Sequence, residues 1–166
     1  MQNKALYLLA QFDDETQDIL SSYYETLQHH GLIGKQTKNI PYHFTLGCKD
    51  INCEKQLINQ MSEICTQTEI IDICLAHPGL FGLNVLFIAP NMNFELLKLQ
   101  HRFFENCGYG CHLWTPHATI LLDDQENILK ALPIVSENFK PFRAQIISIG
   151  LYEFFPTRCI KEFKLV

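Results

Sequence analysis

Short apolar segments alternate with polar segments along this chain, and their spacing separates strands from helices. The run KALYLLAQF over residues 4–12 is apolar and leads into the acidic stretch DDETQD. This is typical of a strand followed by a helix whose first turn carries carboxylates near the positive end of the helix dipole. The helix is predicted over 14–30 and ends at Gly31, because glycine readily adopts the conformation that terminates helices.

The same reasoning extends to the rest of the chain. β-Branched and aromatic residues bounded by Pro and Gly favour strands, whereas apolar residues three and four apart favour helices. Further strands are predicted at 41–47, 69–79, 83–90, 113–122, 142–154 and 159–166. Further helices are predicted at 53–67, from Asn93 to Gly108, and at 124–132. The order β-α-β-α-β-β-α-β-α-β-β indicates an α+β fold rather than a repeating parallel α/β fold.

The two halves of this order echo each other, and each half contains one copy of a short pattern. NIPYHFTLG holds His43 and Thr45, and LWTPHATIL holds His117 and Thr119. Side chains two apart on a strand share a face, so each strand would offer an imidazole beside a hydroxyl on one face and apolar residues on the other. Four polar groups converge if the strands lie side by side or face to face. The structural alternative is a pair of partly buried histidines bonded to their neighbours.

Paired H-hydrophobic-T-hydrophobic strands, one in each half of a chain of this size, resemble the two-histidine (2H) phosphoesterase superfamily. This superfamily includes RNA 2',3'-cyclic phosphodiesterases and 2'-5' RNA ligase-like proteins. The resemblance covers the layout of nearly the whole chain, from an opening strand that ends at Phe12 to the closing stretch GLYEFFPTRCIKEFKLV. It implies a single bilobal, pseudo-symmetric α+β domain over 1–166, with two antiparallel sheets facing a central cleft and helices on the outside.

The activity implied by the resemblance is metal-independent hydrolysis of a 2',3'-cyclic phosphate, on a nucleotide or an RNA end, or of a related 2'-5' phosphodiester. Imidazole gives or takes a proton near neutral pH, as general acid-base catalysis requires. The resemblance makes His43 the proton donor and His117 the acceptor that activates water, although the pattern itself is symmetric. The hydroxyls of Thr45 and Thr119 would donate to the non-bridging phosphate oxygens. No cofactor is expected. The alternatives are a non-catalytic nucleotide-phosphate or RNA-end sensor and a 2'-5' RNA ligase.

The second motif departs from the family pattern in one respect. Some members follow it with a basic residue that holds phosphate, whereas this chain continues with LLDD at 121–124. The departure favours a smaller nucleotide, or a phosphate contact supplied elsewhere by Arg158 or Lys49. Aromatic faces hold bases by stacking. The candidates for such stacking are Phe12, Tyr42, Phe81 and Trp114.

The net charge of −5 argues against an extended nucleic-acid surface, because dense phosphate contacts need clustered Lys and Arg. The expected partner is a small nucleotide or an RNA terminus bearing a cyclic phosphate, bound by a monomer. No apolar run approaches the length of a transmembrane helix, and the N-terminus has no secretory cleavage pattern. We therefore expect a soluble, cytoplasmic protein that does not bind membranes.

The 7 cysteines are odd in number and scattered, which is typical of reduced thiols. Cys107, Cys111 and His112, together with His117, suggest zinc ligands. No C-x-x-C pair accompanies them, and His117 already belongs to the strand motif, so no metal site is expected. The other histidines are interpreted as structural or solvated: His29, His30, His77 and His101.

Overall fold

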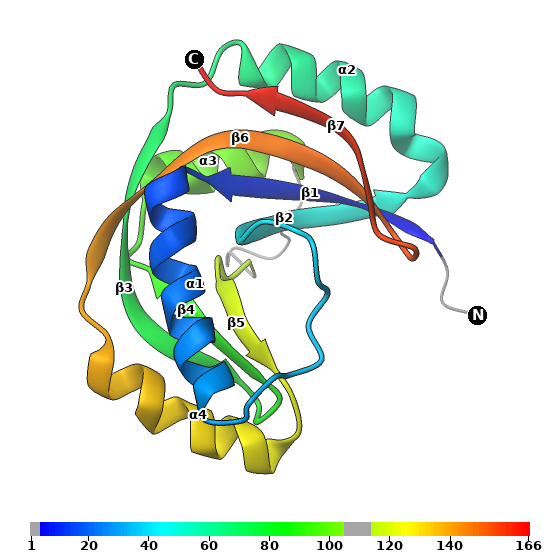
Figure 1. The fold of residues 1–166 in the computed structure, drawn as a ribbon. Coiled ribbons are helices and arrows are strands. Elements are labelled where there is room, and N and C mark those ends of the chain that lie inside the picture. Colours follow the sequence, from blue (N-terminus) through cyan, green and yellow to red (C-terminus); the bar gives the residue numbers. More distant parts are fainter. Residues whose placement is uncertain (1–3, 105–113) are drawn as a thin grey trace.

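The computed structural model describes residues 4–104 and 114–166, and it confirms the α+β class (Figure 1). Within these ranges the strands and helices follow one another in the predicted order. They are β1 (Ala5–Phe12), α1 (Asp14–His29), β2 (His43–Asp50), α2 (Glu54–Cys65), β3 (Ile71–Phe81), β4 (Val85–Pro90), α3 (Phe94–Phe103), β5 (Ala118–Leu122), α4 (Gln125–Asn138), β6 (Phe142–Phe154) and β7 (Arg158–Lys164). A short 3-10 helix, Ile51–Cys53, precedes α2.

The strands form an antiparallel sheet in the order β2-β1-β6-β3-β4-β5, with β7 also pairing with β6. If β1, β2 and β3 are replaced by β4, β5 and β6, respectively, and vice versa, the same strand order is obtained when read from the other end of the sheet. The halves β1-α1-β2-α2-β3 and β4-α3-β5-α4-β6 are therefore related by a pseudo-twofold axis between β3 and β6. The third strand of each half pairs with the first strand of the other half. Thus β6 pairs with β1, and β3 pairs with β4.

The two expected sheets are two wings of this one sheet, and β6 joins them. Residues 142–146 of β6 pair with β3, and residues 146–154 pair with β1. We call β2, β1, the later part of β6 and β7 the first wing, and β3, β4 and β5 the second wing. The sheet bends so far that β2 and β5, at opposite ends of the strand order, come into contact (Figure 1). This contact brings the two motif strands together.

Each wing is covered by helices on its outer face. Helices α1 and α4 pack against the second wing, whereas α2 contacts β6 and β7 and α3 contacts β2 of the first wing. Alternate residues of the strands, such as Leu6 and Leu8 of β1, are fully buried under these helices. The other faces of β1, β2 and β5 are left for the concave side between the wings. No described helix is long and apolar enough to cross a membrane.

The largest differences between predicted and observed boundaries occur at β5, α4 and α3. Strand β5 begins at Ala118 rather than 113, since Pro116 has no N–H group to pair. Helix α4 continues past 132 to Asn138, with Pro133 exposed on its solvent side, where water can satisfy the carbonyl that proline leaves unpaired. Helix α3 ends at Phe103, and residues 105–108 of the longer predicted helix lie outside the described residues.

Candidate functional site

A β-bulge follows the threonine of each motif. On β2, Thr45 pairs with Leu9 and Gly47 with Leu8, so Leu46 is the extra residue. The second motif repeats the arrangement. On β5, the residues on either side of Ile120 pair with consecutive residues of β4, so Ile120 is extra. A bulge increases the local twist of a strand and redirects its side chains, and bulges are frequent beside active sites.

Burial alternates along both motifs as the sequence predicted. Phe44 and Leu46 are 0% and 1% exposed, and Ala118 and Ile120 have the same two values. His43, Thr45 and Thr119 are only partly buried, because they project from the opposite, concave face. His117 is also partly buried and directly precedes β5.

The two imidazoles have the same hydrogen-bond arrangement. His43 Nδ1 lies 2.7 Å from the carbonyl oxygen of Pro41, and His117 Nδ1 lies 2.8 Å from that of Thr115. A carbonyl oxygen only accepts, so Nδ1 donates in both rings and carries a proton. Each ring therefore keeps Nε2 for exchange with a ligand.

Burial lowers the pKa of both imidazoles. The pKa of His43 is lowered from its ordinary value by desolvation first, and the nearby His117 lowers it further by charge repulsion. Desolvation also lowers the pKa of His117. The hydrogen bonds to the Pro41 and Thr115 carbonyls oppose these shifts in part. The repulsion means that the two rings are close enough to influence each other's protonation.

Aromatic rings hold His117 in place. Phe81 meets the imidazole edge to face with ring centroids 4.6 Å apart, and Phe87 lies at 5.3 Å in a tilted arrangement. Gly79 makes room for Phe87, since a Cβ there would lie 2.5 Å from its ring. Phe81, a sequence candidate for base stacking, is thus engaged with a motif histidine.

Two further contacts fix the motif strands. The indole Nε1 of Trp114 donates to the backbone carbonyl of Thr45 at 2.8 Å, which ties the segment before His117 to β2. On the other side of β2, the side-chain amide of Gln17 donates to the carbonyl of Tyr42 and accepts from its N–H, both at 2.8 Å. Trp114 and Tyr42, expected as stacking residues, are therefore held by their own hydrogen bonds beside the motifs.

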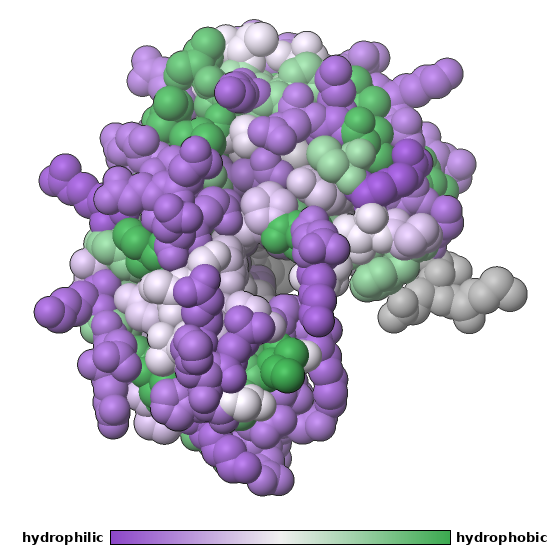
Figure 2. All heavy atoms as spheres, in the orientation of Figure 1, coloured by the Kyte–Doolittle hydropathy of each residue, from purple (hydrophilic) through white to green (hydrophobic). Residues whose placement is uncertain are grey.

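A cavity of about 670 Å³ opens on the concave side, and Figure 2 shows this face hollowed near its centre. His43, Thr45 and Thr119 line its middle. His117 lies beside it but is not one of its lining residues. The remaining lining residues are Tyr7, Leu9, Tyr24, Gln28, the segment 35–42, Ile120, Leu122, Phe154 and Phe155. None of these described lining residues is Asp or Glu, although the chain has 18 acidic residues.

Three sequence candidates lie away from the cavity. Phe12 is 3% exposed and packs edge to face against Phe44, so it cannot stack on a base. Arg158 forms an ion pair with Glu153 instead of a phosphate site. Lys49 lies over the ring of Phe104, 5.2 Å from its centroid.

An aromatic cluster at one end of the cavity was not predicted. Tyr7 and Phe154 meet edge to face at 5.0 Å, and Phe154 and Phe155 do so at 5.4 Å. Phe155 is 51% exposed, so much of its side chain is open to solvent at the cavity. The FFP sequence at 154–156 was a signal for such an exposed aromatic pair, whereas the contribution of Tyr7 depends on strand pairing.

The segment 31–42, which we call the strap, runs from α1 to β2 and forms the other end of the cavity. Its Lys35 N–H donates to the Leu122 carbonyl at 2.6 Å, which attaches it to the edge of β5. Gly34 has a φ of +72°, and a Cβ there would lie 2.6 Å from Leu121, so this crossing requires glycine. The clamp by Gln17 at Tyr42 holds the strap at its far end.

The described residues contain no cluster of three or more His, Cys, Asp or Glu side chains that could hold a metal ion. Cys107, Cys111 and His112, the other members of the suggested zinc set, lie outside the described residues. The free cysteines that are described include the buried Cys65, whose pKa burial raises to about 11.

No protein-family model and no curated protein matches the sequence. Solved structures do match over nearly its full length. Apo LigT from E. coli is 16% identical with a TM-score of 0.67, and the match covers 100% of this chain and 99% of LigT. LigT bound to 3'-AMP has the same identity and coverage and a TM-score of 0.66. TT0787 of Thermus thermophilus is 12% identical with a TM-score of 0.63, over 97% of both chains. The chain therefore has the fold of the 2H phosphoesterase superfamily, as its motifs predicted.

Proposed function

We propose that this chain, which has the 2H phosphoesterase fold, is a metal-independent phosphodiesterase. Its substrate would be a 2',3'-cyclic phosphate on a nucleotide or an RNA end, or a related 2'-5' phosphodiester. One observation carries the proposal: two equivalent H-x-T pairs converge on the concave face with both Nδ1 atoms bonded to the carbonyl two residues earlier. A histidine that only packs in the core would not need a second copy in the same arrangement. Two such histidines are needed when protons are moved on two sides of one phosphorus atom.

The hydrolysis needs two proton transfers at one phosphate. A water oxygen attacks phosphorus in line and loses its proton to Nε2 of one imidazole, while the bond to a ribose oxygen breaks. That oxygen takes a proton from Nε2 of the other imidazole, so the overall charge and proton count are unchanged. The hydroxyls of Thr45 and Thr119 donate to the non-bridging oxygens, where negative charge builds up.

The resemblance makes His43 the donor and His117 the acceptor, and we keep this assignment as the proposal. Burial and repulsion by His117 both lower the pKa of His43. A bound phosphate dianion or monoanion favours the charged form of a neighbouring imidazole. The donor role of His43 therefore requires that substrate raise its pKa.

The cavity supports a nucleotide as the ligand. Phe155 is exposed and the neighbouring Phe154 is partly buried, and together they offer aromatic surface on which a base can stack without sequence preference. The lining residues that are described carry no carboxylate to repel a phosphate. A structure of E. coli LigT holds 3'-AMP, which is a ligand of the same class.

The test measures hydrolysis of adenosine 2',3'-cyclic phosphate by the wild type and by His43→Ala and His117→Ala. Each substitution is expected to lower kcat at least about 10²-fold, because general acid-base catalysis contributes that much per group. His29→Ala, at the exposed end of α1, is the matched control and should leave the rate unchanged. Activity is expected to persist in EDTA.

A phosphodiester with a p-nitrophenyl leaving group separates the two roles, because this group departs without protonation. If His43 is the donor, His43→Ala loses much less activity on this ester than on the cyclic substrate, while His117→Ala loses activity on both. Near-wild-type turnover in either alanine variant contradicts the proposal. Tight nucleotide binding by the wild type with no turnover favours the sensor alternative.

A further inference from the structure

We infer that the cleft binds a nucleotide carrying a second phosphate, which Lys38 of the strap contacts while the reacting phosphate lies at the motif histidines. This inference rests on the proposed function and specifies its substrate class. On a ribose whose 2' and 3' oxygens react, the second phosphate belongs on the 5' oxygen.

The first observation behind this inference is the charge of the residues that line the cavity. Its described lining holds two lysines, Lys35 and Lys38, and no carboxylate. Lys35 is already paired, with Asp124 at 2.7 Å and Asp123 at 3.7 Å. Within the described part of the chain, Lys38 forms no ion pair. In a protein with a net charge of −5, an unpaired ammonium group at a carboxylate-free cavity is suited to an anionic ligand group.

The strap holds Lys38 between two fixed points. On one side, the Lys35 N–H is bonded to β5, and the Leu122 N–H donates to the Gln36 side-chain oxygen at 3.4 Å. On the other side, Gln17 clamps the backbone of Tyr42. The ammonium group is therefore presented by a segment attached to both a wing and a helix, which limits the entropy lost when a ligand binds.

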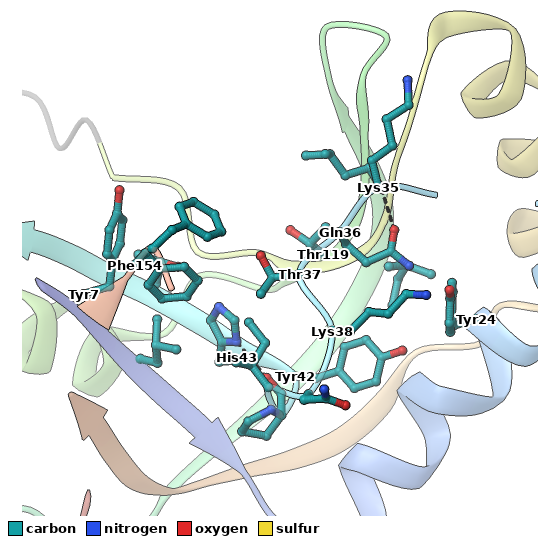
Figure 3. A pocket seen from close by; sticks show the side chains of 18 of the residues that line it. Tyr7, Tyr24, Lys35, Gln36, Thr37, Lys38, Tyr42, His43, Thr119 and Phe154 are labelled. Atoms are coloured by element: carbon teal, nitrogen blue, oxygen red, sulfur yellow. Dashed lines mark hydrogen bonds between the residues drawn. The ribbon is translucent and has the colours of Figure 1, made fainter. Parts of the chain in front are cut away.

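Lys38 lies at the opposite end of the cavity from the aromatic cluster. Figure 3 shows Tyr7 and Phe154 on one side of His43, and Lys38 extending on the other side toward Tyr24. Burial raises the pKa of the neighbouring Tyr42 to about 12, so that phenol stays uncharged and does not repel an anion. One cavity thus offers an aromatic surface, a reaction centre and a cation in sequence, as a base, a reacting phosphate and a second phosphate require.

The test compares the affinities of adenosine 3'-monophosphate and adenosine 3',5'-bisphosphate by calorimetry. The wild type is expected to bind the bisphosphate at least about fivefold more tightly, the gain that one exposed ion pair with phosphate can supply. Lys38→Ala should reduce this ratio to about one, and Lys38→Arg should retain it. Lys130→Ala, which removes another exposed ammonium group, on α4 and away from the cavity, is the control and should leave the ratio unchanged.

A wild-type ratio near one, or a ratio that survives in Lys38→Ala, overturns the inference. The measurement uses stable ligands and needs no turnover. A protein that prefers the bisphosphate through Lys38 but hydrolyses nothing would refute the proposed reaction and retain the second-phosphate site. A protein that hydrolyses the cyclic phosphate without preferring the bisphosphate would support the proposed reaction and refute the second-phosphate site.

Discussion

His43 and His117 share one hydrogen-bond arrangement but meet different neighbours. His117 has aromatic rings beside it, whereas His43 lies at the cavity and also feels the charge of His117. In both residues the carbonyl bond at Nδ1 fixes the ring and favours its protonated form, while burial favours the neutral form. Burial is the larger effect in each case, so both rings are predominantly neutral in the unliganded protein at neutral pH.

These shifts predict the pH dependence of the reaction. One ring must be protonated and the other neutral, so kcat/KM peaks between their two pKa values. Both pKa values are lowered from 6.5, which puts the centre of the bell-shaped kcat/KM profile below pH 6.5. A bound phosphate raises the pKa values of both imidazoles. The kcat profile is therefore expected to be centred at a higher pH than the kcat/KM profile. Steady-state rates across the acid and neutral range check this, and a kcat/KM centre above pH 6.5 contradicts it.

Gln17 shows how a helix controls the geometry of a motif on a strand. Its amide bonds to both backbone groups of Tyr42, the residue between Pro41 and His43. The Pro41 carbonyl in turn accepts from His43 Nδ1. Helix α1 therefore orients the imidazole through the backbone, and we regard Gln17 as a positioning residue.

Gln17→Ala is expected to lower kcat about tenfold with a smaller effect on KM, because a displaced general acid or base loses much of its contribution. Since the Pro41 bond raises the pKa of His43, loosening it should also move the His43 limb of the pH profile to lower pH. A purely structural role would reduce the rate without moving that limb. Ser22→Ala, at an exposed position of the same helix that does not line the cavity, is the control.

The sequence predicted the elements and the motif faces well, for identifiable reasons. The apolar residues Phe44 and Leu46, two positions apart, marked the buried face of β2. The repeated H-x-T pattern marked the opposite face. The strap was missed because its role depends on Lys35 bonding to β5 and Gln17 bonding to Tyr42, contacts between residues far apart in the chain. Sequence proximity to the motifs suggested Lys49, whereas the described lysines at the cavity are Lys35, which is paired with carboxylates, and Lys38.

The charge distribution of the whole molecule limits the length of RNA that could contact it under the proposed function. The net charge is −5, and the described cationic side chains at the cavity are Lys35 and Lys38. A cavity of about 670 Å³ has the size of a small-ligand site and not of an extended groove. Under the proposed function, we therefore expect contacts beyond the terminal nucleotides to add little affinity.

RNA length provides the corresponding test. A dinucleotide and a longer RNA, both ending in a 2',3'-cyclic phosphate, are expected to have KM values within about threefold of each other. The affinity of both should depend only weakly on salt, as expected for about two phosphate contacts. Competition assays at low and moderate salt measure both quantities. A longer RNA that binds more than about tenfold tighter, with a steeper salt dependence, would reveal an extended binding surface.

The exchange of third strands between the halves makes each half of the chain incomplete by itself. Severed in the turn between β3 and β4, the N-terminal piece would keep β1 and β3 but lack β6, which lies between them. The C-terminal piece would keep β6 and β4 but lack β3, which lies between those two. Each fragment would then be a sheet with a gap shaped for a strand of the other, and it would carry a single H-x-T pair. Under the proposed function, we expect catalysis by the severed pieces only after they reassociate, which would couple the appearance of activity to completion of the fold.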